Sequence, residues 1–288
     1  MVIISQHYDY GGPGQSMKPH ETSAPDPVRS TEYLRYVALG DSQTEGVGDG
    51  DDITGLRGWA DRLAENLTVG NPGFRYANLA VRGRRAGEVR AEQLGPALAL
   101  RPDVATVVAG VNDLLRPRVE TAAVVGHLEA MFAALTESGA RVATVTFPDL
   151  TRVIPLARPV RSRILDINDR IRAAAARHGV AVAEIARHSS VADRRFWSED
   201  RLHCSPLGHQ LIADAVAHAL GVPGSSDSWT QPPPPDLMPT PRGAAAELRW
   251  AATFLRPWLG RRLRGQSSGD QRTAKHPQLH RIEAPRLS

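Results

Sequence analysis

Three separate segments of this chain contain the residue types that a serine nucleophile needs. Ser42 follows a Gly-Asp pair, Asn112 lies within Gly-Val-Asn-Asp, and Asp200 precedes His203 by three positions. A serine hydroxyl becomes a nucleophile when a histidine takes its proton and a carboxylate orients that histidine. Hydrogen-bond donors must then hold the oxyanion that forms. These residue types predict acyl-transfer chemistry at one site, assembled from parts that are far apart in sequence.

The sequence offers more than one candidate for the oxyanion donors and for the base. Gly83 offers a backbone N–H with no side chain in the way, and Asn112 offers a side-chain amide. His209 is a second candidate base, but it lies in a predicted helix where packing is its expected role, so His203 is preferred. The plainer alternatives are a surface turn at Ser42 or Gly83 and a helix cap at Asn112.

Apolar runs alternate with helical patterns between residues 36 and 220. The expected strands cover 36–39, 74–80, 104–109, 141–147 and 180–185, and the expected helices cover 59–67, 86–100, 120–138, 161–178 and 206–220. Strands separated by helices form a parallel sheet with helices on both faces, and ligands bind at the carboxyl ends of its strands. Because Ser42, Gly83 and Asn112 each lie just past a predicted strand, the pattern predicts that they meet at that edge.

Composition divides the chain into a folded domain and its extensions. The first residues are rich in Gly, Pro, Ser and His, and four consecutive prolines stand at 232–235. Such segments form disordered chain or a stiff, extended linker. The predicted parts are a disordered extension (1–33), a catalytic domain (34–222), a Pro-rich linker (223–243), an amphipathic helix interrupted by Pro257 (244–266) and a disordered basic tail (267–288).

The composition also excludes several classes of protein. The 288 residues contain one cysteine, Cys204, which rules out an internal disulfide and gives no support to a four-cysteine or mixed Cys/His metal site. No apolar stretch approaches the ~20 residues that span a bilayer, and no secretory signal is evident, so we expect a cytoplasmic protein. The net charge of +4 comes from the basic C-terminal tail, so nucleic acid is not an expected partner. The oligomeric state stays open.

The motif segments resemble the SGNH hydrolases, also called GDSL esterases or lipases. The match is carried by Gly-Asp-Ser-Gln-Thr-Glu-Gly at 40–46, Asn-Leu-Ala-Val-Arg-Gly at 78–83, Gly-Val-Asn-Asp at 110–113 and Asp-Arg-Leu-His at 200–203. One such motif is a weak signal, whereas all four in the family's order within residues 36–220 are specific.

The resemblance implies a fold and a set of roles. The implied fold class is α/β, a three-layer α/β/α sandwich of flavodoxin-like type with a five-stranded parallel sheet, and the site needs no metal and no cofactor. Ser42 is the implied nucleophile, His203 the base and Asp200 its partner. The backbones of Ser42 and Gly83 and the side chain of Asn112 are the implied oxyanion hole.

Two departures from the family pattern bear on the substrate. Arg82 stands where serine is frequent and Cys204 where proline is frequent, and neither removes a catalytic group. Arg82 and Arg84 flank the glycine of the second motif, and Arg116 follows the third motif. Arginine forks bind carboxylate and phosphate, so these three residues predict an ester with an anionic remote part. The alternative is a solvated, arginine-rich surface.

The expected function is hydrolysis of a small-molecule or lipid carboxylic ester through an acyl-enzyme on Ser42. A sugar O-deacetylase or an acyltransferase would use the same groups. A non-catalytic protein that binds a membrane or a partner is a more distant alternative. The helix expected at 244–266 either docks on the domain or contacts an anionic membrane peripherally.

Overall fold

The computed structural model describes residues 33–69, 71–149, 151, 154–231, 243–264 and 267–282. The extension predicted at 1–33 therefore lies outside the described residues except for Tyr33, and so does most of the Pro-rich linker. No helix in the described ranges combines the length and the apolar content that crossing a membrane requires.

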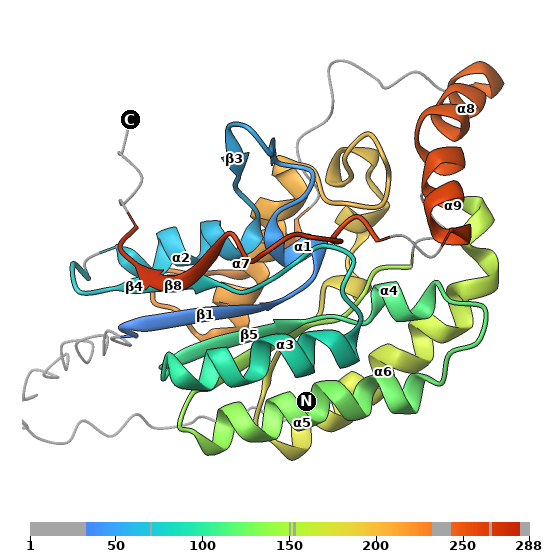
Figure 1. Ribbon diagram of the computed structural model, residues 1–288. Helices are drawn as coiled ribbons and strands as arrows, with labels where there is room; N and C mark the ends of the chain where they lie inside the picture. Colours follow the sequence, from blue (N-terminus) through green and yellow to red (C-terminus); the bar gives the residue numbers. More distant parts are fainter. Residues whose placement is uncertain are drawn as a thin grey trace, which may run out of the picture. The chain divides into compact units, whose positions relative to one another are not determined.

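A six-stranded sheet forms the centre of the fold, with the order β7-β6-β5-β1-β4-β8 (Figure 1). Neighbours among the first five strands pair in parallel, and β8 pairs with β4 in antiparallel fashion. The strands are β1 (Arg35–Gly40), β4 (Arg75–Asn78), β5 (Val104–Val108), β6 (Arg141–Val145), β7 (Ala181–Ala183) and β8 (His276–His280). The five predicted strands are thus present, and a sixth is added at the edge.

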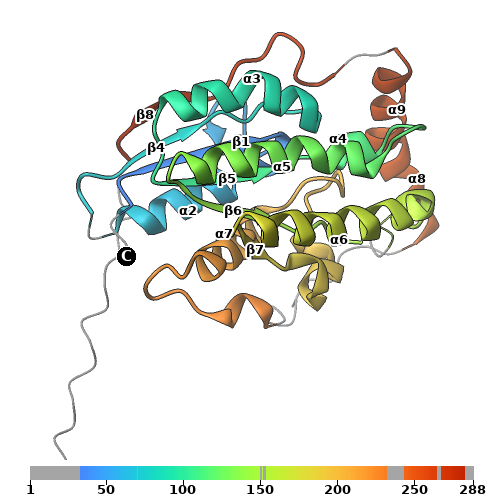
Figure 2. The same ribbon diagram turned by 90° about the horizontal axis from the view of Figure 1, so that it is seen from below.

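Helices cover both faces of this sheet, which confirms the predicted three-layer fold. On one face lie α2 (Trp59–Thr68) and α7 (Pro206–Leu220), and on the other lie α3 (Ala86–Ala99), α5 (Thr121–Glu137) and α6 (Arg161–Arg177) (Figures 1 and 2). Two short helices, α1 (Ser42–Glu45) and α4 (Val111–Leu114), follow β1 and β5, and a small hairpin joins β2 (Gly50–Asp51) to β3 (Gly55–Leu56).

Local sequence explains where these elements begin and end. All five residues of β5 are buried and three of them are valine, as expected for a central strand that is covered on both faces. Helix α7 begins with Ser205, whose side chain accepts from Gly208 N, and with Pro206 at its first position. It ends at Gly221, whose φ of 70° favours glycine.

The C-terminal helix covers 244–263, within the predicted range of 244–266, but it is not interrupted at Pro257 as the sequence predicts. It comprises α8 (Ala244–Trp250), a π-helical turn (Ala251–Leu255) and α9 (Arg256–Leu263). Pro257 has no N–H to donate and its ring needs room beside the preceding turn. The wider π-helical turn ends at Leu255, two residues before Pro257, and the helix continues where an interruption was expected.

The prediction of a disordered tail at 267–288 is wrong for the described part of it. Residues 276–280 form β8, in which His280 pairs with Tyr76 and His276 pairs with Asn78. The rings of both histidines pack within 6.3 Å of the Tyr76 ring centroid. The sequence His-Pro-Gln-Leu-His has no alternating apolar pattern, so only this tertiary pairing makes it a strand.

Candidate active site

The strand order brings three motif loops to one edge of the sheet. β1 lies between β4 and β5, so the chain first forms β4 on one side of β1 and then crosses back to form β5 on the other side. Such a reversal leaves a crevice at the carboxyl ends of the strands. Ser42 follows β1, Gly83 follows β4 and Asn112 follows β5, and all three line one cavity.

The turn that carries the serine is held rigidly. A Cβ on Gly40 would overlap the side chain of Thr44 and a carbonyl of β5, so only glycine fits there. The side chain of Gln93 pins the same residue, accepting from Gly40 N at 2.8 Å and donating to Gly40 O at 2.9 Å. Asp41 then caps helix α1. Ser42 is therefore fixed at the end of a central strand.

Ser42, His203 and Asp200 form a continuous chain of hydrogen bonds. His203 Nε2 lies 2.9 Å from Ser42 Oγ, and His203 Nδ1 lies 2.6 Å from Asp200 Oδ2. Asp200 Oδ1 accepts from the Ser198 hydroxyl at 2.7 Å and from two backbone N–H groups of its own loop at 2.9 and 3.0 Å. Arg201, with a φ of 60°, makes the tight turn within this loop.

These contacts determine where the protons lie. Burial on its own would raise the pKa of Asp200, but the hydrogen bond and the charge of His203, together with the other donors, hold that pKa well below its usual range. The ionised carboxylate can only accept, so His203 Nδ1 carries the proton of the neutral ring. Nε2 is then free to accept the proton of Ser42, which is what a general base requires.

His209, the second candidate base, has a different role. It is fully buried, its Nδ1 accepts from Trp59 N at 3.1 Å, and its Nε2 faces Val47 O at 3.2 Å. Burial lowers the pKa of His209 to about 4, so the ring stays neutral. The histidine thus ties α7 to the start of α2, and the preference for His203 agrees with the geometry.

The three expected oxyanion donors surround the same space. In the described part of the chain, the backbone N–H groups of Ser42 and Gly83 have no hydrogen-bond acceptor. Gly83 has a φ of 79°, which glycine adopts without strain. Asn112 Nδ2 donates to Asp41 Oδ2 at 3.2 Å and to Arg84 O at 3.1 Å. The amide of Asn112 must therefore exchange a partner to bind a substrate oxygen.

Asp41 is a member of the site that sequence reasoning assigned no role. Its carboxyl is only 4% exposed, and burial raises its pKa to about 7 despite hydrogen bonds from Gln43 N and Asn112. The carboxyl lies beside the nucleophile and orients the oxyanion amide. The only sequence signal for this is its place directly before Ser42.

Gln43 is a second residue that sequence reasoning left without a role. Its Nε2 donates to Leu202 O at 2.8 Å, and its Oε1 accepts from Cys204 N at 3.3 Å. Gln43 thus forms hydrogen bonds with the backbone on both sides of His203. Its place in the first motif was visible in the sequence, but its distant partners were not.

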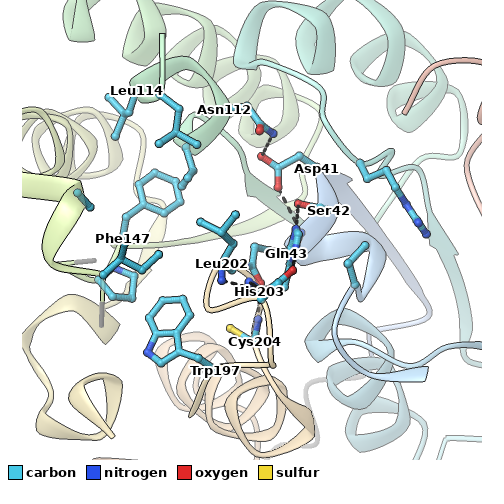
Figure 3. Close-up of a pocket in the computed structure, with 18 of the residues that line it drawn as sticks. Asp41, Ser42, Gln43, Asn112, Leu114, Phe147, Trp197, Leu202, His203 and Cys204 are labelled. Carbon is cyan, nitrogen blue, oxygen red and sulfur yellow. Dashed lines mark hydrogen bonds and ion pairs between the residues drawn. The ribbon is translucent and has the colours of Figure 1, made fainter. Parts of the chain in front are cut away.

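The site opens into a large apolar cavity of about 650 Å³. Figure 3 shows Leu114 and Phe147 across this cavity from Ser42 and His203, and Trp197 beside Cys204. Much of the remaining lining is also apolar and includes Val145, Ile164, Ile185, Phe196, Trp250 and Phe254. The nucleophile therefore faces a space suited to an apolar group.

The arginines that were expected to bind an anion already have partners in the protein. Arg82 bonds Glu45 and Asp52, both at 2.8 Å, and its side chain is 13% exposed. Arg84 pairs with Glu92 at 2.8 Å. Arg116 lines the cavity and is, of the three, the one without a carboxylate within salt-bridge distance among the described residues. Arg82 and Arg84 therefore make internal ion pairs, which match neither the anion site nor the solvated surface that the sequence suggested.

The described residues contain no group of three or more His, Cys, Asp and Glu side chains arranged to hold a metal ion.

Two further polar residues near the site have structural roles. Cys204 lies beside the base and is buried, and burial raises the pKa of its thiol far above the usual range. Asp113 accepts from Ala86 N at 3.0 Å, so it anchors the start of α3.

The protein thus has an α/β fold whose cavity contains a serine, a histidine and a carboxylate joined by hydrogen bonds. The sequence model of the GDSL-like lipase/acylhydrolase family matches residues 38–211, a range that contains all four motifs. The chain therefore belongs to this family, and the resemblance seen in the sequence is confirmed. No curated protein sequence matches the chain.

Several solved structures share the fold. An α/β hydrolase from the metagenome of Lake Arreo is 22% identical, with a TM-score of 0.54 over 66% of this chain and 95% of its own. A variant of an acetyl xylan esterase from Geobacillus stearothermophilus is 17% identical, with a TM-score of 0.53 over 66% and 95%. A lipase/acylhydrolase from Enterococcus faecalis is 20% identical, with a TM-score of 0.52 over 65% and 96%. At these identities the similarity shows the fold alone.

Proposed function

We propose that this protein hydrolyses carboxylic esters through an acyl-enzyme on Ser42. The observation that carries the proposal is the hydrogen-bonded series from Ser42 Oγ through His203 to Asp200, at 2.9 and 2.6 Å, inside one cavity. Family membership supports a hydrolase. The free backbone N–H groups of Ser42 and Gly83 supply the remaining part that acyl transfer requires.

In the first half-reaction, Ser42 Oγ attacks the acyl carbon while its proton passes to His203 Nε2. Asp200 stabilises the imidazolium that results. The carbonyl oxygen becomes an oxyanion, which the N–H groups of Ser42 and Gly83 and the amide of Asn112 hold. The bond between the acyl carbon and the alcohol oxygen then breaks, and the alcohol leaves with the proton from Nε2.

In the second half-reaction, water takes the place of the alcohol. His203 Nε2 accepts a proton from the water as its oxygen attacks the acyl carbon of the acyl-enzyme. The same donors hold the second oxyanion. The bond between the acyl carbon and Ser42 Oγ breaks, Nε2 returns its proton to that oxygen, and the carboxylic acid leaves.

Covalent labelling tests this proposal directly. The full chain treated with a fluorophosphonate should carry the phosphonate on Ser42, as mapped by peptide mass spectrometry. Ser42→Ala should abolish both labelling and the burst of p-nitrophenol from p-nitrophenyl acetate. Ser138→Ala, at the end of α5, is the matched control and should retain both. Labelling elsewhere, or a burst from Ser42→Ala, would reject the proposal.

A transferase using the same site is the second candidate, because an alcohol can attack the acyl-enzyme in place of water with the same base. Product analysis separates the two reactions. Hydrolysis yields free acid even at high alcohol concentration, whereas a transferase yields a new ester. Acetylated sugars offered beside simple esters test the O-deacetylase alternative in the same assay.

A further inference from the structure

The C-terminal helix forms part of the cavity wall, although it lies outside the residues that match the family. The family match ends at residue 211, whereas Trp250, Phe254 and Leu255 line the cavity together with Ser42 and His203. The helix formed by α8, the π-helical turn and α9 stands beside α4 and α6, at one end of the sheet (Figure 1). This wall is therefore a feature of this chain and not of the shared domain.

Specific contacts fix this helix to the catalytic loop. Trp250 Nε1 donates to the carbonyl of Asp200 at 3.3 Å, and the Arg201 guanidinium lies 4.5 Å from the centroid of the Trp250 ring. Arg201 also makes two hydrogen bonds to Glu247, at 2.6 and 2.7 Å. Because Trp250 is only 8% exposed, the helix is docked on the domain. Docking is thus favoured over the alternative in which this helix lies on a membrane.

The segment after the helix reaches the other side of the site. A Cβ on Gly83 would overlap the Ser267 side chain, and a Cβ on Gly269 would overlap the carbonyl of Arg82. The C-terminal extension therefore packs against the loop of an oxyanion donor as well as the loop of the base. Residues of this extension, among them Trp250 and Ser267, therefore line the cavity beside both loops.

The enclosed apolar part suits the acyl group better than the alcohol. The alcohol must leave and be replaced by water between the two half-reactions, so its place must be open to solvent. The acyl group stays on Ser42 throughout, and a place lined by buried side chains such as Phe147, Ile164 and Phe196 excludes water from it. A cavity of about 650 Å³ is far larger than an acetyl group needs and lies within the range for whole small-molecule ligands.

We propose that the cavity is an acyl pocket for unbranched aliphatic chains of about eight carbons or more, and that Phe254 of the C-terminal helix is a specificity-determining residue in its wall. This inference rests on the proposed function and names its substrate class. Each methylene that enters such a pocket raises kcat/KM by up to about four-fold. The enzyme therefore prefers medium and long acyl esters to acetate esters.

The test compares two ester series with the full chain. In p-nitrophenyl esters from acetyl to dodecanoyl, kcat/KM should rise with each two-carbon step to octanoyl or beyond. In acetate esters of alcohols of increasing length, no comparable rise should occur. A preference for acetyl, or a rise confined to the alcohol series, would overturn the inference.

Two variants of one helix separate a pocket wall from a general structural role. Phe254→Ala should lower the ratio of kcat/KM for octanoyl to that for acetyl about ten-fold, since it removes contacts made with the long chain only. Leu248→Ala is the matched control, because Leu248 is 72% exposed on the same helix, and it should leave the ratio unchanged. An unchanged ratio in Phe254→Ala, or equal falls in both variants, contradicts the assignment.

A binding measurement keeps the inference distinct from the proposed function. Decanoate should bind to Ser42→Ala in calorimetry, and adding Phe254→Ala should weaken its affinity about ten-fold. If no ester is cleaved but decanoate binds in this way, the proposed function fails and the pocket assignment stands. If esters of all lengths are cleaved equally and decanoate does not bind, the pocket assignment fails and the proposed function stands.

Discussion

Asn112 Nδ2 donates a hydrogen bond to the buried carboxyl of Asp41, at a distance of 3.2 Å. This bond joins the residue before the nucleophile to the proposed oxyanion donor at the end of the neighbouring strand. It fixes the amide in the lining of the cavity that Ser42 also lines, and the second N–H of the amide, now on Arg84 O, is the one to be exchanged for a substrate oxygen. Such preorganisation is the main source of oxyanion stabilisation in enzymes.

Removing this amide should slow the chemistry with little effect on folding. Asn112→Ala is expected to lower kcat for p-nitrophenyl acetate by about 10²–10³-fold, since one oxyanion donor is lost. Asn71→Ala serves as the control, because Asn71 donates to Tyr33 O at 2.8 Å and does not line the cavity. A kcat for Asn112→Ala equal to that of the control would remove Asn112 from the mechanism.

The raised pKa of Asp41 predicts how stability depends on pH. Burial raises this pKa from 3.8 to about 7. Between these values the unfolded chain ionises Asp41 while the folded chain keeps it protonated, so stability is lost as the pH rises. A pKa difference of one corresponds to about 1.4 kcal/mol, so the loss between pH 4 and pH 8 should be about 4 kcal/mol.

Urea unfolding at several pH values measures this effect. Asp41→Asn removes the ionisation, so this variant should gain stability relative to the wild type by about that amount as the pH rises from 4 to 8. Asp169→Asn is the control, because the side chain of Asp169 is 78% exposed. Parallel pH profiles for the wild type and Asp41→Asn would contradict the prediction.

His209 predicts a change of stability in the acid range. Burial lowers its pKa from 6.5 to about 4, so the unfolded chain takes up a proton on this ring before the folded chain does. Stability should therefore fall by about 3 kcal/mol as the pH drops from 6.5 to 4. His209→Gln should lack this contribution and still react with a fluorophosphonate at pH 8. If the variant loses that reaction while remaining folded, His209 takes part in the chemistry.

The ion pair between Lys275 and Asp61 should contribute much more to the free energy of unfolding than the more exposed pair between Arg272 and Asp52. Lys275 Nζ lies 2.6 Å from Asp61 Oδ2, with side chains 16% and 13% exposed. Burial raises the pKa of Asp61, and Lys275 opposes that rise. Lys275→Met leaves a buried carboxylate without its partner and should cost about 3–5 kcal/mol of unfolding free energy.

Two further variants check that prediction. Arg272→Met breaks a pair with Asp52 whose side chains are 40% and 47% exposed, and it should cost less than about 1 kcal/mol. Adding Asp61→Asn to Lys275→Met should restore part of the stability, because the buried charge is then gone. Equal costs for the two single variants would show that burial of the pair does not matter.

Much of the fold could be predicted because its signals are local. Apolar runs located all five parallel strands, and glycines at 139 and 179 located helix ends. The strand β8 could not be predicted in this way, since its residues become a strand only by pairing with β4. Likewise, nothing near Trp250 in the sequence indicates that its indole reaches the carbonyl of Asp200.

The candidate site follows the same division. The strand pattern was enough to expect Ser42, Gly83 and Asn112 at one edge, because parallel strands deliver their following loops there. The contact of Ser42 with His203 and Asp200 was expected from the family resemblance. The partners of Arg82 could not be foreseen, since Glu45 ends α1, Asp52 lies between β2 and β3, and only the folded chain brings them within 2.8 Å. Charge alone therefore suggested an anion site where the structure has internal ion pairs.

The antiparallel pairing of β8 has a consequence for assembly of the protein. β4 lies in the first third of the chain, but the backbone groups on its outer edge pair only with β8, which follows α9 in the sequence. Until that segment arrives, the exposed row is a template for a strand from another molecule. Shortened versions of this protein that end after α9 should therefore tend to associate edge to edge, and a free peptide with the sequence of 276–280 could cap them.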